Sequence, residues 1–159
     1  MKVSVKFPKG LPIPELKNRK IAQILNRFAA ISVVHLKKEH RGRRDIDGNP
    51  IKRLKLSTVK AKKKRGIAKV PSRPLAETGE MIGGIHRHKK ATAKDLESGL
   101  MIPKSRQKIA TYHLEGKGSL PVRKFFGVGK KLEKKLNKYL GLHLSKIIAI
   151  HRKKMKLKK

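Results

Sequence analysis

The chain has 159 residues, no cysteine, and 44 Lys and Arg against 10 Asp and Glu, which gives a formal net charge of +34. Its length fits one domain with tails, and the lack of cysteine excludes disulfides and thiolate-bound zinc. An ordinary small domain carries a net charge of only about 2–8, so the composition indicates a protein that works beside a polyanion.

The N-terminal region predicts an arm followed by a long helix. Residues 1–13 are punctuated by prolines and are expected to form an arm or a first strand, and Pro14 suits the first turn of a helix. Apolar residues then recur at helical spacing as far as Leu36, which is typical of one buried face. This spacing predicts a helix over 14–41, with Gly42 as its C-terminal stop.

A turn and a short basic helix are expected next. Residues 47–50 read Asp-Gly-Asn-Pro, a dense turn signal. Ser57 is a candidate N-cap for a helix that ends at Gly66. Five positive charges lie within this helix: Lys60, Lys62, Lys63, Lys64 and Arg65.

The second half predicts strands, a loop and another helix. Segment 67–84 holds prolines and glycines that forbid a long regular element, and 85–92 and 99–112 are the predicted strands. Gly116, Gly118 and Pro121 indicate a loop. A helix is expected from about Lys130, and Gly141 is expected to interrupt or end it.

Candidate catalytic and metal sites are weak throughout. His86 and His88 would share one face of a strand, but no cysteine or well-placed carboxylate joins them. Asp45 and Asp47 flank a turn, where Asp occurs for its side-chain hydrogen bonds to the backbone. The glycine–lysine run at 127–131 departs from the phosphate-binding loop pattern in its glycine spacing and its last residue. The sequence therefore predicts a non-enzymatic protein without metal or cofactor.

The charge fits several polyanions. Nucleic acid is the first candidate, and an acidic protein or an anionic membrane surface are the others. Aromatic residues make up only 4% of the chain, so backbone phosphate contacts are favoured over base stacking. No stretch approaches the roughly 18 uncharged apolar residues of a membrane span, and no membrane partner is expected.

Three segments follow one another in an order that is more informative than any of them alone: residues 47–66 with 74–81 after a short gap, residues 110–128, and the helix that follows. The residues that carry the pattern are Asp47, Gly48, Leu54, Ser57 and Thr58, then Leu75, Thr78, Gly79 and Met81, then Tyr112, His113, Gly116, Pro121, Arg123, Phe125 or Phe126, and Gly127. Together they resemble the phage virion morphogenesis family, also called tail completion proteins. The likeness covers roughly residues 45–140. It departs from the family pattern at Ile51, where an aromatic is frequent.

The resemblance implies an α+β fold, a small antiparallel sheet flanked by a long N-terminal helix and a C-terminal helix, with basic terminal extensions. The expected organisation is an arm at 1–13, a tail-completion-like domain at 14–141 and a basic extension at 142–159. The implied function is structural: a homo-oligomeric ring in the virion neck or tail, at the head–tail junction, assembled in the host cytoplasm. Its implied neighbours are neck, portal or tail proteins and the packaged DNA.

Two sets of candidate site residues follow. Contacts to nucleic acid or an acidic partner are expected from the basic helix at 60–65 and from Lys153, Lys154 and Lys156. The motif residues expected at subunit contacts are Thr78, Gly79, His113, Gly116, Pro121, Arg123, Phe125 and Phe126. For the two Phe residues the alternative is simple packing in a core. Arg123 is expected to hold a carbonyl or carboxylate at a subunit contact.

Two other hypotheses stay open. A ribosomal or other RNA-binding protein would explain the small size, the extreme basicity and the low aromatic content, but it explains the ordered motifs less well. A basic scaffold or chromatin-like condensing protein is the third hypothesis.

Overall fold

The computed structural model describes the backbone of residues 2–6, 18–66, 70–75, 78–118 and 120–156, and the side chains within these ranges except those of 2–6, 144 and 146–156. In this part of the chain, strands β1 (Lys2–Lys6), β2 (His86–Lys89) and β3 (Glu97–Met101) form one antiparallel sheet in the order β1–β3–β2. The helices are α1 (Asn18–Arg41), α2 (Leu56–Arg65), α3 (Glu80–Gly83), α4 (Gln107–Glu115) and α5 (Lys130–Lys156), and a 3-10 turn spans Lys104–Arg106. The expected α+β class is confirmed.

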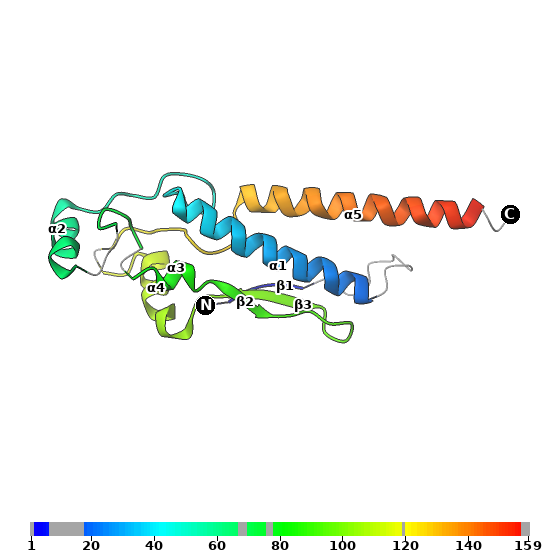
Figure 1. The fold of residues 1–159 in the computed structure, drawn as a ribbon, viewed down its shortest axis with the longest axis horizontal. Helices are drawn as coiled ribbons and strands as arrows, with labels where there is room; N and C mark the ends of the chain where they lie inside the picture. The colour runs from blue at the N-terminus through cyan, green and yellow to red at the C-terminus, as the bar shows by residue number, and fades with distance from the viewer. Residues whose placement is uncertain (1, 7–17, 67–69, 76–77, 119, 157–159) are drawn as a thin grey trace.

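Helix α1 forms the middle layer of the molecule. It packs on β3 and β2 with one side and against α5 with the other, so that it lies between the sheet and α5 (Figure 1). Its buried positions include Ile21, Ile24, Leu25 and Leu36, which belong to the stripe that the helical spacing predicts. The helix ends at Arg41, directly before Gly42. Positions 14–17 of the predicted helix lie outside the described residues.

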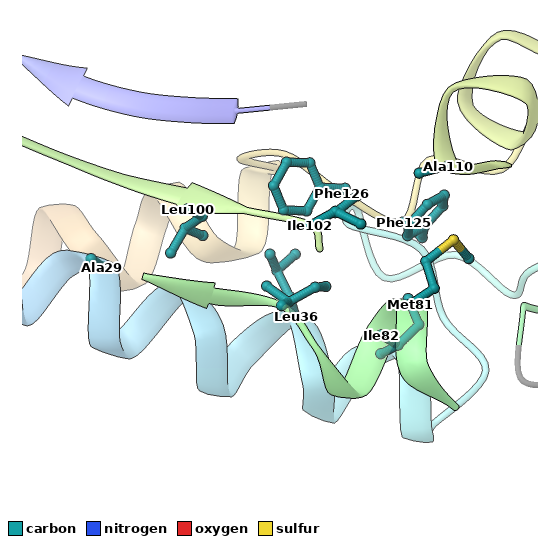
Figure 2. Close-up of a cluster of buried hydrophobic side chains, with 10 residues drawn as sticks. Ala29, Leu36, Met81, Ile82, Leu100, Ile102, Ala110, Phe125 and Phe126 are labelled. Atoms are coloured by element: carbon teal, nitrogen blue, oxygen red, sulfur yellow. The ribbon is translucent and has the colours of Figure 1, made fainter. Parts of the chain in front are cut away.

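Two clusters of buried side chains hold these layers together. The first joins α1, β3, α3 and the segment before α5, and it includes Leu36, Ile102, Phe125 and Phe126 (Figure 2). The second joins the start of α1 to Ala91, and Tyr139 of α5 packs against it with its ring edge-on to Phe28 at 5.8 Å. Burying a large aliphatic or aromatic side chain contributes about 1.5–3 kcal/mol.

A turn fixes the start of α5. The Asp45 carboxylate accepts hydrogen bonds from the backbone N–H groups of Asp47 (2.9 Å) and Asn49 (2.8 Å), and Gly48 takes a φ of 89°, as the turn signal predicts. The Asp47 carboxylate accepts a further bond from the Lys130 N–H at 3.3 Å, in the first turn of α5. The turn thus supplies an acceptor to one of the free N–H groups at a helix start.

The predicted strand over 99–112 is wrong beyond Met101. Pro103 follows shortly after β3 and cannot continue a sheet ladder, and residues 107–115 form α4 instead. The side-chain amide of Gln107 donates to the Ile102 carbonyl at 3.0 Å, and Ala110 is completely buried on the inner face of α4. Packing of this small inner face decides the helical conformation.

Two further expectations about helix ends need correction. Helix α2 begins at Leu56 with Lys55 at the N-cap and no side-chain cap, so Ser57 is not the cap, whereas Gly66 ends the helix with a φ of 68° as expected. Helix α5 runs through Gly141 to Lys156, so the basic extension continues the helix as far as Lys156. A single glycine costs a helix only about 1 kcal/mol, which a helix of this length can sustain.

Candidate functional site

The first two of the three motif segments meet at one cavity. It has a volume of about 700 Å³ and is lined by residues from 52–65, 75–81, 106–113 and 118–123. These segments belong to α2, α4 and the loops beside them, at the end of the molecule opposite the C-terminus (Figure 1). The motif residues on its wall are Leu54, Thr58, Leu75, Thr78, Gly79, Met81, His113, Pro121 and Arg123. The fold therefore gathers residues that the sequence separates widely.

The lining of this cavity combines cations with apolar groups. No acidic side chain is among its lining residues. Its cationic residues are Lys52, Arg53, Lys55, Lys62, Arg65, Arg106 and Arg123. Its apolar residues are Leu54, Leu75, Met81, Ile109, Leu120 and Pro121. Such a wall suits a ligand that carries both negative charge and apolar surface.

Arg123 and His113 form a hydrogen-bonded pair on the cavity wall. Arg123 is only 4% exposed, and its Nη1 donates to Nδ1 of His113 at 3.1 Å. The backbone N–H of Arg123 also donates to the His113 carbonyl at 2.8 Å. The buried Nε of Arg123 has no hydrogen-bond partner in the structure. The guanidinium, expected to hold a carbonyl or carboxylate, thus holds an imidazole within its own chain and keeps one donor unused.

The electrostatics of this pair favour a neutral imidazole. Burial lowers the pKa of His113 below its ordinary value, and the positive charges of Arg123 and Lys62 lower it further. Burial also lowers the pKa of Arg123. A neutral His113 with its proton on Nε2 offers Nδ1 as the acceptor that the guanidinium needs.

Lys62 differs from the rest of the basic cluster. It is 7% exposed, and its Nζ donates to the Arg73 carbonyl at 3.2 Å, so it ties α2 to the following loop. Little of its side chain is therefore accessible to an external polyanion in the folded chain, and the expected contact stays a prediction. Its neighbours Lys60, Lys63, Lys64 and Arg65 are exposed. Lys153, Lys154 and Lys156 lie on α5, and their side chains are outside the described residues.

Two glycines of the motif lie at helix ends near the cavity, and Gly79 is one of its lining residues. Gly79 takes a φ of 79° directly before α3, where the Glu80 N–H donates to the Thr78 hydroxyl at 3.3 Å. Gly116 ends α4 with a φ of 70°, and a Cβ there would lie 2.7 Å from Cγ2 of Val122. Leu75 also adopts a positive φ of 58°, which is uncommon for a residue other than glycine. Such backbone conformations concentrate at ligand-binding sites.

Phe125 and Phe126 belong to the interior and not to this cavity. They are 2% and 5% exposed and pack among the side chains of the first cluster (Figure 2). Neither ring has the exposed surface that a subunit contact would require. Pro121, by contrast, is partly buried and lines the cavity.

Sequence reasoning missed several lining residues. The predicted strand over 99–112 does not bring Ile109 to the site; on a helix, Ile109 and His113 are four residues apart and share a face. Lys52 and Arg53 lie in a loop with no motif of their own. Arg106 forms an ion pair with Glu80, a contact between distant segments that no local pattern signals.

The described residues contain no group of three His, Asp or Glu side chains placed to hold a metal ion. His86 and His88 are both exposed on β2, and Nδ1 of His86 lies 2.8 Å from the Gly84 carbonyl. None of the described helices is both long and apolar enough to cross a bilayer. Comparison with family models, with curated proteins and with solved structures yields no match to this chain.

Proposed function

We propose that this protein is a structural subunit of a phage neck or tail, a tail-completion or head–tail joining protein that forms a ring close to packaged DNA. The observation that supports this function best is the convergence of the motif segments on one cavity. Thr78, His113 and Arg123, which the likeness marks in separate parts of the sequence, all line this cavity.

The distribution of charge agrees with a position near DNA. Lys60, Lys63 and Lys64 project from α2, and the basic half of α5 extends from the opposite end of the molecule (Figure 1). Lysines that neutralise phosphates release condensed counterions, and this attraction requires no base readout. A net charge of +34 also opposes self-association in free solution, so anionic surroundings would favour ring assembly.

The test is to locate the protein in particles. Antibody-labelled electron micrographs of virions from a host that produces this chain should place it at the head–tail junction, as a symmetric ring. Deletion of its gene should leave filled heads and tails that fail to join, and the protein supplied in trans should restore joining.

The RNA-binding alternative predicts a different result. In that case the chain would sediment with ribosomes or RNA, nuclease treatment would release it, and particles would assemble without it. This outcome would overturn the proposed function.

A further inference from the structure

We propose that the cavity is a binding site for an acidic, amphipathic peptide segment of a different protein. Carboxylates of the segment would pair with the cationic residues that line the cavity, here called the cationic rim. An apolar side chain would pack against Ile109, Met81 and Leu120. The proposal goes beyond the structural role in the virion and does not depend on it.

The unused donor on Arg123 is the first argument. A buried N–H without a partner costs free energy, and a charged group costs more than a neutral one. Nε of Arg123 is buried, lies in a residue of the cavity wall and has no partner. A bound carboxylate is the natural acceptor for a guanidinium, because its two oxygens match the N–H fork of Arg.

The apolar part of the wall argues for a peptide over nucleic acid. A phosphate backbone carries no apolar group that would occupy the surface of Leu54, Ile109 and Leu120. Binding of unpaired bases generally uses aromatic platforms, and no Phe, Tyr or Trp lines this cavity. The volume of about 700 Å³ falls in the range of sites that enclose part of a ligand, roughly 300–1,000 Å³.

The charge of the chain argues against a second copy as the occupant. The whole chain has only 10 acidic residues. Several of them already have cationic partners: Glu80 pairs with Arg106, Asp95 and Glu97 pair with Lys89, and Glu115 pairs with Lys117. The occupant must therefore come from a more acidic protein, for which the cationic rim provides both attraction and selectivity.

The experiment measures binding of a fluorescein-labelled synthetic peptide, in which Asp and Glu alternate with pairs of Leu, to the full chain by fluorescence anisotropy. The pocket variant is Lys52→Glu with Arg53→Glu. Its matched control is Lys63→Glu with Lys64→Glu, which changes the net charge equally at exposed positions outside the cavity lining. The pocket variant should weaken binding at least about tenfold more than the control.

A second pair of variants tests the apolar contact. Ile109→Ser removes an apolar group from the wall, where Ile109 is 44% exposed, and Val34→Ser removes a 68% exposed apolar group from α1, outside the cavity lining. We expect Ile109→Ser to weaken binding and Val34→Ser to leave it unchanged. All four variants alter exposed positions, and thermal unfolding verifies that each is folded.

Three results would overturn the proposal. The first is no binding of the peptide to the native chain. The second is equal weakening by the two charge variants, or equal binding of a peptide with Leu replaced by Ser, since either indicates attraction to net charge alone. The third is a duplex oligonucleotide that depends on Lys52 and Arg53 more strongly than the peptide does. None of these results bears on ring formation or on head–tail joining, so the two proposals fail separately.

Discussion

Arg123 donates to Nδ1 of His113 from Nη1 and to the His113 carbonyl from its backbone N–H, so two hydrogen bonds join the same pair of residues. The pair attaches the segment before α5 to α4. Phe125, two residues further on, then enters the core with 2% exposure. Arg123, which lines the cavity and has an unpartnered buried Nε, therefore also positions a core aromatic.

This pair predicts a loss of stability in mild acid. Burial lowers the pKa of His113, and it lowers those of His35 and His40 as well. The unfolded chain then takes up protons near the ordinary His pKa of about 6.5 while the folded chain resists, so acidification favours unfolding. The free energy of unfolding that the neutral, buried histidines contribute is complete above about pH 6.5, and it is lost as the pH falls toward and through their lowered pKa values.

Chemical denaturation at about pH 7.5 and about pH 5.5 measures this loss. Both pH values lie above the range in which most carboxylates titrate. His113→Gln keeps an acceptor for Arg123 but does not titrate, so its stability should change less over the same interval. A native chain that is equally stable at the two pH values would contradict the prediction.

The basic helix predicts a graded salt dependence of DNA binding. Replacing Lys60, Lys63 and Lys64 with Ala should lower the slope of log affinity against log salt, by at most about one unit per lost phosphate contact. Lys62→Met should leave the slope unchanged, because Lys62 is turned inward onto the Arg73 carbonyl. It should instead lower the free energy of unfolding by about 1–3 kcal/mol. A salt slope that responds to Lys62 and not to the other three would refute the assignment.

Sequence periodicity was sufficient for α1 and insufficient for α4. The apolar stripe of α1 extends over many turns, so its period is unambiguous. Residues 107–115 form only a short helix, and Ala110 is its one fully buried side chain. So short an apolar pattern does not distinguish a helix from a strand. Ala110 packs in the first cluster, and this packing decides that the segment is helical. No local sequence pattern indicates it.

Some members of the site were predictable, but not all of them and not their arrangement. Glycine positions such as Gly79 and Gly116 were identifiable because positive φ values favour that residue. The basic run 60–65 was visible too, but nothing in a series of lysines tells which one turns inward. Lys62 does so only because the Arg73 carbonyl lies beside it, and that contact joins segments that the sequence alone does not bring together.

Phe125 distinguishes core packing from subunit contact. Phe125→Ala should destabilise the protein by about 3–5 kcal/mol, because it leaves a cavity in the first cluster. Val122→Ala, at a 57% exposed position in the same segment, should change the free energy of unfolding by less than about 0.5 kcal/mol. Urea denaturation at low protein concentration measures both. If Phe125→Ala left stability unchanged and altered only assembly, the Phe125 side chain would belong to a subunit interface.

Two glycines of the last helix region predict effects of opposite sign. Gly129 lies directly before α5, and a Cβ there would collide with the Ile46 carbonyl and lie 2.9 Å from the Asp47 carboxylate. Backbone on the opposing turn cannot move aside without disturbing the Asp47 bond to Lys130, so Gly129→Ala should cost about 1–3 kcal/mol.

Gly141 lies within α5, and a Cβ there meets nothing within 4 Å. Gly141→Ala should therefore stabilise the helix by about 0.5–1 kcal/mol, because alanine loses less backbone entropy. Thermal unfolding followed by circular dichroism compares the two variants with the native chain. A destabilising Gly141→Ala would mean that α5 bends or is contacted at that point, and a neutral Gly129→Ala would mean that the turn at 45–49 does not hold the start of α5.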